Sequence, residues 1–493
     1  MVPHAKPTQV DQANVRGMVT LPDRRSFLQH TACGLGAAAL SQLLAEDGFA
    51  RSTNEFSDPL HPRAPHFQPR AKRVIFLFMA GAPSQVDLFT PKPAMRRLHE
   101  QPIPASFLEG LDDSVLKANA RVFASPRTFS KHGDCGMDFS DYLPNLATCA
   151  DEVCMIRSVT TDTANHHPGQ LLMNCGQPVF GLPSMGSWLS YGLGSECRDL
   201  PGFVVLLSKN GSGDLGGSSL WSNAFLPAVH RGVTFRSQGD SILHLSSPTG
   251  VTNRMQQERI AAIQQFNQLR MEQQPDSEIA SRIASYELAY RMQVAAPDML
   301  DLSGESAETL ERYGVDDKVM GTYGRNCLMA RRLVERGVRF VQLYHYTWDD
   351  HANLNVKLKE NCQITEQPTA TLIHDLRERG LLEDTLVVWG GEFGRTPMAE
   401  VRRGSSPGKE GRDHHPFSFT MLMAGGGVKA GFTLGDTDEI GYHVTEQPVH
   451  VHDIQATILH CLGVDHERLT FRHQGRDFRL TDVAGNVVRD ILA

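Results

Sequence analysis

The sequence predicts a doubly wound α/β fold, with a mostly parallel sheet covered by helices on both faces, and three observations support that prediction. Short, continuous apolar runs recur along the chain, stretches with helical spacing of apolar residues lie between them, and polar clusters adjoin three of the runs. Runs that are apolar throughout are typical of strands buried on both faces. Their alternation with helices is the pattern of a sheet between two helical layers.

Six apolar runs are candidate strands. Each is short, rich in β-branched or aromatic residues, and bounded by polar residues or glycine; they cover residues 74–79, 153–156, 203–207, 338–343, 386–389 and 419–423. In a sheet of this kind, ligands collect beyond the carboxyl ends of the strands.

Helical patterns are expected over residues 320–336, 364–379 and 451–462. Gly380 and Gly463 follow the last two patterns, where a glycine commonly ends a helix. Residues 253–293 are rich in Gln, Arg and Glu and contain two amphipathic patterns split near Pro275. We interpret them as a solvated helical hairpin inserted on the sheet, with a partner-binding arm as the alternative.

The N-terminal 50 residues are predicted to be a targeting segment. Arg24 and Arg25 precede Ser26-Phe27-Leu28 and then a weakly apolar stretch, residues 31–45, which is too short to span a bilayer. This pattern indicates export by the twin-arginine translocase to the periplasm or the exterior. The alternative is a buried N-terminal helix preceded by chance arginines. We expect residues 51–71 to be a linker and residues 72–493 a single domain.

The composition narrows the choice of partners. The chain has 493 residues, 40% of them hydrophobic, and a formal net charge of -8, so no basic surface for nucleic acid is expected. No segment after the signal approaches about 18 consecutive apolar residues, so no further transmembrane span is expected. The cysteines form no C-x-x-C pair, which argues against a zinc ribbon or a thioredoxin-like motif.

Three clusters of Asp, Glu and His residues adjoin predicted strands. They occupy residues 344–351 after one run, 390–396 after the next, and 411–416 just before the last run. Each cluster alone is more often a hydrogen-bonded surface pair or a turn. At successive strand ends of one sheet, however, they would converge on one crevice. A mixed Asp, Glu and His ligand set suits zinc, manganese or iron better than magnesium or calcium.

Several longer motifs carry a resemblance to a known family. They are residues 76–87 (FLFMAGAPSQVD), 165–170 (NHHPGQ), the three clusters, and the C-terminal helix pattern 451–460. With them the chain resembles a secreted bacterial family catalogued as a domain of unknown function (number fifteen hundred and one) in the alkaline phosphatase-like and sulfatase-like superfamily. The resemblance covers essentially everything after Lys72. It implies one or two divalent cations over the sheet, zinc or manganese favoured, and hydrolysis or transfer of phosphate or sulfate esters.

The resemblance also implies metal ligands. Asp349 and His351 match a ligand pair, Glu392 stands where an Asp normally ends the next strand, and His414 matches the last ligand, with Asp413 or His415 able to assist. Phe393 replaces the usual His or Asn after Glu392. The first strand normally ends in a metal-binding Asp, whereas this chain reads Ala82-Pro83-Ser84, with Asp87 three residues later.

The nucleophile motif of sulfatases is altered. Where those enzymes carry Cys or Ser in C/S-x-P-x-R, this chain has His166, and Gln170 replaces the arginine. A formylglycine sulfatase is therefore excluded. His166 could be a metal ligand, a phosphohistidine nucleophile, a general acid or base, or a loop-packing residue. Thr161, Thr163 and Ser84 are alternative nucleophiles.

The sequence thus predicts an exported metal-dependent hydrolase acting on a small-molecule or polysaccharide ester, with His166 and Arg395 as catalytic residues. Arg395 or Arg412 could hold a substrate oxyanion, or either could pair with a neighbouring carboxylate. The alternative is a non-catalytic, metal-containing carbohydrate- or surface-binding protein on the same fold. A redox protein is disfavoured, because the sequence has no haem motif or nucleotide fingerprint.

Overall fold

The computed structural model describes residues 58–104, 107, 121–208, 216–236, 242, 250, 252–273, 277–400 and 408–493. The predicted twin-arginine segment, and residues 51–57 of the predicted linker, lie outside these residues. Residues 58–71 form no helix or strand, but they are hydrogen-bonded to the rest of the chain. The backbone N–H of Arg63 donates to the Leu193 carbonyl, and that of Ala71 donates to the Cys461 carbonyl.

A nine-stranded sheet forms the centre of the fold, in the order β12-β4-β11-β8-β1-β7-β5-β6, with β15 paired beside β4. The strands are β1 (Arg73–Ala80), β4 (Val153–Thr160), β5 (Phe203–Leu207), β6 (Val233–Arg236), β7 (Phe340–Tyr346), β8 (Thr385–Gly390), β11 (Phe419–Ala424), β12 (Phe432–Leu434) and β15 (Val449–His450). All pairings are parallel except those of β11, which is antiparallel to β4 and β8. The six predicted strands and the mostly parallel sheet are therefore confirmed.

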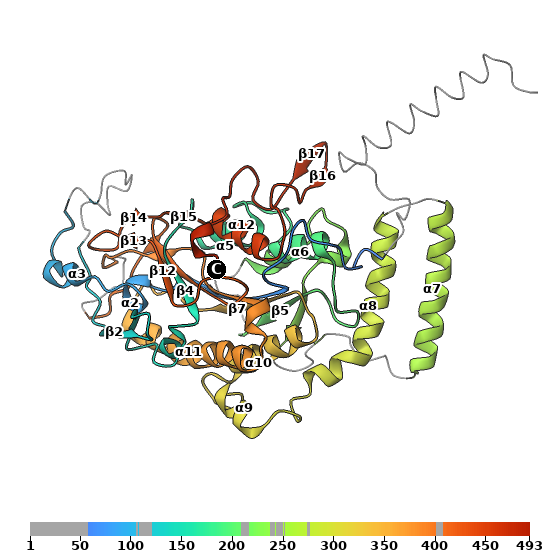
Figure 1. Cartoon of the computed structure of the whole chain (residues 1–493), viewed down its shortest axis with the longest axis horizontal. Helices are drawn as coiled ribbons and strands as arrows, with labels where there is room; N and C mark the ends of the chain where they lie inside the picture. The colour runs from blue at the N-terminus through green and yellow to red at the C-terminus, as the bar shows by residue number, and fades with distance from the viewer. Residues whose placement is uncertain are drawn as a thin grey trace, which may run out of the picture. The chain divides into compact units, whose positions relative to one another are not determined.

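Helices cover both faces of the sheet (Figure 1). On one face, Ile75 and Leu77 of β1 pack in a cluster with α10 (Gly321–Glu335) and α11 (Leu354–Glu378). On the other face, Phe76 and Phe78 pack with α5 (His166–Cys175), α6 (Met185–Leu193) and α12 (Val451–Cys461). Because alternate residues of a strand point to opposite faces, a continuous apolar run is what two covered faces require.

The predicted helices are present, with one boundary changed. The patterns at 320–336 and 451–462 correspond to α10 and α12, and the pattern at 364–379 is the second half of α11, which begins at Leu354. The insertion forms two helices, α7 (Asn253–Gln273) and α8 (Ser277–Leu300), which lie side by side in Figure 1.

Shorter elements fill the remaining described chain. They are α2 (Gln85–Leu88), α3 (Pro93–Leu98), α9 (Ala307–Arg312), and the strand pairs β2 (Phe129–His132) with β3 (Met137–Ser140), β9 (Gly394–Arg395) with β10 (His414–His415), β13 (Asp436–Thr437) with β14 (Val444–Glu446), and β16 (Phe471–His473) with β17 (Arg476–Phe478). The β9–β10 pair matters for function, because it joins the chain after β8 to the chain before β11.

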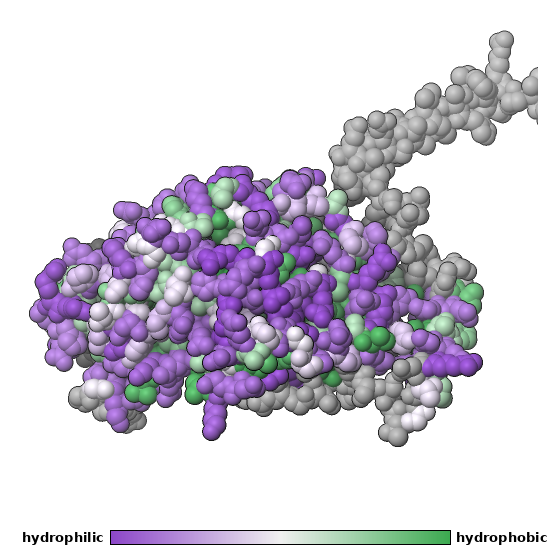
Figure 2. All heavy atoms as spheres, turned by 60° about the horizontal axis from the view of Figure 1, so that its bottom comes forward, coloured by the Kyte–Doolittle hydropathy of each residue, from purple (hydrophilic) through white to green (hydrophobic). Residues whose placement is uncertain are grey.

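The described surface has a mixed, mainly hydrophilic character on the face drawn in Figure 2, where apolar residues are scattered in small groups. Among the helices that the structure describes, none has both the length and the apolar composition that crossing a bilayer requires.

Candidate metal centre

Three histidines and one aspartate from separate segments meet beyond the carboxyl ends of the central strands. His166 is the first residue of α5, Asp349 and His351 lie in the loop after β7, and His414 lies in β10. β11 runs antiparallel to β8, so the chain that enters β11 lies at the same sheet edge as the chain that leaves β7. The structure therefore brings together Asp349, His351 and His414, three of the four predicted ligands, and adds His166.

The imidazole Nε2 atoms face one carboxylate oxygen. Asp349 Oδ1 lies 2.9 Å from Nε2 of His351, 3.1 Å from that of His166, and 3.2 Å from that of His414. Arg395 Nη2 lies 2.6 Å from the same atom. A carboxylate oxygen offers about two lone-pair sites, so it cannot accept four hydrogen bonds. His166 Nε2 is also buried without a hydrogen-bond partner among the described residues.

The other ring nitrogen of each histidine is held by an oxygen. Nδ1 of His166 lies 2.7 Å from Glu392 Oε1, Nδ1 of His351 lies 2.5 Å from Glu400 Oε2, and Nδ1 of His414 lies 2.7 Å from the Ala164 carbonyl. Since all three oxygens are acceptors, each Nδ1 carries a hydrogen and donates it. In the neutral imidazole, this leaves the Nε2 lone pairs directed at the region beside Asp349 Oδ1.

This donor set fits a divalent cation. Zinc binds imidazole nitrogen at about 2.0–2.1 Å, which in a tetrahedron separates neighbouring ligand atoms by about 3.3 Å. The three separations from Asp349 Oδ1, 2.9, 3.1 and 3.2 Å, are close to that value. Three imidazole nitrogens and one carboxylate oxygen also suit zinc better than magnesium or calcium.

Glu392 does not join the group of atoms that face Asp349. Its carboxylate is fully buried, and its Oε1 accepts from the Gly81 backbone N–H at 3.0 Å and from Gln170 Nε2 at 3.1 Å as well as from His166. Its Oε2 is buried with no hydrogen-bond partner among the described residues. Glu392 therefore contacts the centre through His166.

Arg395 lies beside the centre but is closed to solvent. Its side chain is fully buried, and it donates to Asp349 Oδ1, to the Ala82 carbonyl at 3.1 Å, to the Arg412 carbonyl at 3.0 Å, and to the Gly81 and Trp348 carbonyls. These acceptors satisfy the N–H donors of the Arg395 guanidinium. The contacts orient Asp349 and tie the ends of β1 and β7 together.

Arg412 also forms an ion pair inside the protein. It is fully buried, and its Nε lies 2.7 Å from Asp87 Oδ2 while its Nη2 lies 3.2 Å from Asp87 Oδ1. The Ser84 hydroxyl donates to the same carboxylate. Asp87 is therefore an ion-pair partner that anchors α2, and it does not belong to the four-residue group.

Two backbone features at the strand ends bring these segments into contact. Gly81 follows β1 with φ +105°, and a Cβ at that position would lie 2.6 Å from the Asp349 backbone nitrogen. Thr347 follows β7 with φ +125°, which is strained for a β-branched residue. Asn361 holds it by accepting from the Thr347 hydroxyl at 2.6 Å and donating to its carbonyl at 2.9 Å.

The electrostatics keep Asp349 ionised. Burial alone would raise the pKa of its carboxyl, but the contacts with His166, His351 and His414 and the Arg395 charge lower that pKa far below its usual range. For His166, burial acts to lower the pKa, and the contacts with Asp349 and Glu392 outweigh it and raise the pKa to about 9. A cation would therefore displace a proton from His166 when it binds.

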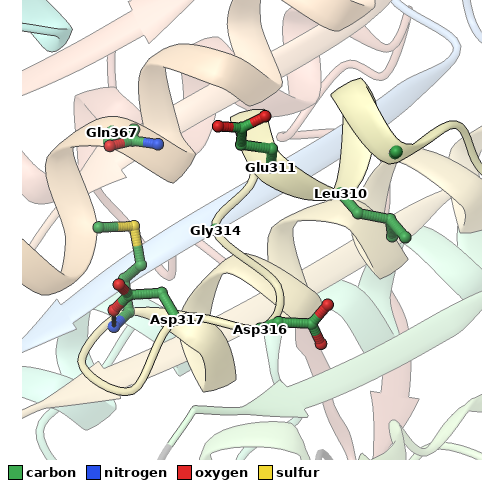
Figure 3. A pocket seen from close by; sticks show the side chains of 8 residues that line it. Leu310, Glu311, Gly314, Asp316, Asp317 and Gln367 are labelled. Carbon is green, nitrogen blue, oxygen red and sulfur yellow. Dashed lines mark hydrogen bonds between the residues drawn. The ribbon is translucent and has the colours of Figure 1, made fainter.

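A cavity lies away from this centre. It has a volume of about 450 Å³ and is lined by residues of α9, of the loop between α9 and α10, and by Gln367 of α11 (Figure 3). Glu311, Asp316 and Asp317 give it an acidic wall. The Asp317 carboxylate accepts from the backbone N–H groups of Val319 and Met320, so it serves the local turn. None of the predicted site residues lines this cavity.

Solved structures that resemble the chain come from several bacteria. A phosphonate monoester hydrolase from Silicibacter pomeroyi has 12% identity and a TM-score of 0.35, with 86% of this chain and 76% of that chain covered. The sulfatase PsFucS1 from Pseudoalteromonas sp. has 12% identity and a TM-score of 0.33, with 87% and 71% covered. The alkaline phosphatase from the Antarctic bacterium TAB5 has 11% identity and a TM-score of 0.29, with 72% and 92% covered.

No curated protein sequence matches the chain. A family model does match, over residues 71–492, and its description is a protein of unknown function, DUF1501. That range includes every strand of the central sheet and all the residues of the candidate centre, and the chain belongs to the DUF1501 family.

Proposed function

We propose that the chain is a metal-dependent hydrolase whose centre binds a divalent cation through His166, Asp349, His351 and His414. One observation carries this proposal: three imidazoles, each held at Nδ1 by an oxygen acceptor, direct Nε2 toward one oxygen of a partly buried aspartate. The nitrogen-rich donor set favours zinc, and the family resemblance keeps manganese as the alternative.

This assignment changes the predicted roles of three residues. The sequence prediction had Glu392 as a ligand and His166 and Arg395 as catalytic residues, with a ligand role left open for His166 and a carboxylate pair left open for Arg395. The hydrogen bonds support His166 as a ligand and Glu392 as the residue that holds it. The full burial of Arg395 and its bonds to backbone carbonyls support a role in orienting Asp349.

When bound, the cation would polarise an ester oxygen and promote ionisation of an attacking water. The protein side chains hold the geometry around it. The Phe393 ring lies with its centroid 5.0 Å from that of His166 and 4.7 Å from that of His414, so it forms an apolar wall beside the ligands. Such a wall limits water and strengthens electrostatic interactions at the reacting atoms.

Two of the three hydroxyl candidates are engaged in hydrogen bonds, which favours attack by water over attack by either of them. Ser84 is buried and donates to Asp87, and the Thr163 hydroxyl accepts from the Asn165 backbone N–H. The hydroxyl of the third, Thr161, is buried with no hydrogen-bond partner among the described residues. If His166 is a ligand through Nε2 and donates through Nδ1, it has no free nitrogen with which to form a phosphohistidine.

We further propose that the substrate is a small-molecule or polysaccharide ester of phosphate or sulfate, and that the protein works in the periplasm or outside the cell after twin-arginine export. The ester class rests on the resemblance of the strand-end motifs to the alkaline phosphatase-like superfamily. The location rests on Arg24, Arg25 and the weakly apolar stretch that follows them.

The test is a panel of phosphomonoesters, phosphodiesters and sulfate esters, offered to the mature protein loaded with zinc or manganese. Turnover that requires the metal and disappears in His351→Ala is the expected result. Binding of metal without turnover of any ester would contradict the hydrolase proposal.

That second outcome would favour a metal-containing carbohydrate- or surface-binding protein. One observation favours this alternative. The two arginines that were predicted to hold a substrate oxyanion, Arg395 and Arg412, are both fully buried and paired with carboxylates. Retention of the metal-loaded protein on immobilised polysaccharide, without hydrolysis, would identify it.

A further inference from the structure

We propose that Glu400 and Glu392 are positioning residues that hold His351 and His166 as Nδ1–H tautomers, and that the centre therefore takes one cation only. The inference deepens the proposed function and rests on it. It assigns a role to Glu400, which no sequence motif marked, and it excludes a second cation between His351, Glu400 and Asp413, three residues that also lie within ligand distance of one another.

Glu400 is fixed in place by the backbone around it. Its side chain is buried, and its backbone N–H donates to the Gly411 carbonyl at 3.0 Å. Gly411 in turn lies against His351, where a Cβ would come within 2.0 Å of the His351 carbonyl carbon. The segment that carries Glu400 therefore packs against the segment before β10 and the loop after β7. In this arrangement the Glu400 carboxylate lies at hydrogen-bond distance from Nδ1 of the His351 ring.

His351 belongs to two groups but can serve only one cation. Its Nε2 faces Asp349 at 2.9 Å, and its Nδ1 faces Glu400 at 2.5 Å. A neutral imidazole has one lone pair, so a cation on the Nδ1 side would need a ring stripped of both protons. With its hydrogen on Nδ1, the ring donates to Glu400 and offers Nε2, the arrangement in which a carboxylate raises the basicity of a metal-binding histidine.

Asp413 already accepts a hydrogen bond on the oxygen nearest to His351. Its Oδ1 accepts from the His414 backbone N–H at 2.8 Å and lies 4.0 Å from His351 Nδ1, so it is the hydrogen on Nδ1, and not this distance, that excludes a cation between them. A second cation beside Asp349 Oδ1 would also be repelled by charge, because the buried Arg395 guanidinium already lies 2.6 Å from that oxygen. Both arguments support a single ion.

Glu392 repeats the arrangement on His166. Three donors converge on its Oε1, and Gln keeps an acceptor oxygen for them while it removes the negative charge. The change Glu392→Gln, like Glu400→Gln, therefore preserves the shape and hydrogen bonds of the support and removes the charge that strengthens the ligand.

The experiment measures zinc stoichiometry by elemental analysis and zinc affinity by chelator competition, on the full chain. The wild type should bind one equivalent. Glu400→Gln and Glu392→Gln should keep that stoichiometry with affinity about 10- to 100-fold weaker, while Asp413→Asn should change neither quantity. With cobalt in place of zinc, both Gln variants should shift the visible absorption bands, which a purely structural defect would leave alone.

A matched control is Glu366→Gln. Glu366 is a buried glutamate of α11 that accepts from the Asn145 and Leu146 backbone N–H groups, and it lies outside both candidate groups. The variant Glu366→Gln should lower the melting temperature of the metal-free protein without changing its zinc affinity.

Three results would overturn the inference. Two equivalents in the wild type, falling to one in Asp413→Asn, would establish a second cation site. Unchanged affinity and cobalt bands in both Gln variants would remove the positioning role and leave the proposed metal centre intact. Loss of all zinc in Glu392→Gln would make Glu392 a ligand. A wild type that binds no zinc would instead overturn the proposed function, and the inference with it.

Discussion

The Arg395 guanidinium lies 2.6 Å from Asp349 Oδ1, and the ion pair joins the strand pair β9–β10 to the loop after β7. Asp349 also faces three imidazole nitrogens, so one carboxylate is shared between a permanent cation of the protein and the proposed metal ion. The arrangement explains why Arg395 is buried: its charge is balanced by Asp349, and its remaining donors are satisfied by backbone carbonyls. A buried charge without such partners would be strongly unfavourable.

Replacing Arg395 should therefore destabilise the fold. Arg395→Met keeps much of the volume but leaves Asp349 without its ion pair and several carbonyls without donors. We expect a loss of about 3–5 kcal/mol in the free energy of unfolding, measured by urea denaturation in chelator. The control is Arg472→Met, in an exposed pair with Asp477, which should cost less than about 0.5 kcal/mol. Equal losses would contradict the role given to Arg395.

The histidine ligands should be required for metal-dependent stability. His166→Ala and His351→Ala each remove one donor, so the bound zinc should fall well below one equivalent, and the rise in melting temperature on adding zinc should largely disappear. His167→Ala is the matched control, because His167 is the exposed neighbour of His166 and lies outside the proposed group. Elemental analysis measures the bound zinc, and thermal melting with and without chelator measures the metal-dependent stability. Full zinc occupancy in both ligand variants would show the site to be wrongly assigned.

Gly81 offers a test of how closely the strand ends must approach. In Gly81→Ala the new Cβ would lie 2.6 Å from the Asp349 backbone nitrogen, so Asp349 must move. We expect weaker zinc binding, by about tenfold or more, together with a lower melting temperature. Gly475→Ala separates steric clash from backbone strain, because Gly475 has a positive φ of +84° but nothing within 4 Å of the added Cβ. It should lower stability slightly and leave zinc affinity unchanged. Identical zinc affinity in the wild type and Gly81→Ala would refute the steric argument.

The sheet was predictable from sequence because both of its faces are buried. A strand covered on both faces must be apolar throughout, so its residues form a continuous run, and all six such runs are strands of the sheet. The convergence of the clusters that contain Asp349, His351 and His414 followed from the rule that ligands gather at strand ends. The choice of these three residues as ligands came from the family resemblance, which also gave Glu392, a residue outside the group.

The contacts that the sequence could not reveal depend on distant segments. Glu400 meets His351 from 49 residues away along the chain, and no periodicity or motif surrounds it. The burial of Arg395 depends on carbonyls of Gly81, Ala82 and Trp348, which only the folded chain brings together. The strained backbone of Thr347 likewise has no sequence signature, because threonine is not a residue type that favours a positive φ.

His230 should make stability fall as the pH decreases below neutrality. Burial, and to a lesser extent the positive charge of Arg63, lowers the pKa of its imidazole to about 3 from the usual 6.5, and its Nδ1 lies 2.9 Å from the Ser190 hydroxyl. The unfolded chain therefore binds this proton near pH 6.5, whereas the folded chain excludes it until about pH 3. Between these values the unfolded state is favoured progressively, so the contribution of His230 is fully present above pH 6.5 and is lost as the pH falls. From pH 7 to pH 5 this amounts to about 2 kcal/mol.

The variant His230→Gln keeps a hydrogen-bonding group for Ser190 but does not titrate. The difference in unfolding free energy between wild type and variant should therefore shift by about 2 kcal/mol, to the disadvantage of the wild type, between pH 7 and pH 5. Urea denaturation at each pH in chelator measures it, since chelator removes any contribution from metal release. Other buried histidines contribute equally to both proteins and cancel in the difference. If the two stability curves run parallel from pH 7 to pH 5, then His230 accepts its proton in the folded protein as readily as in the unfolded chain, and its role as a buried neutral ring is refuted.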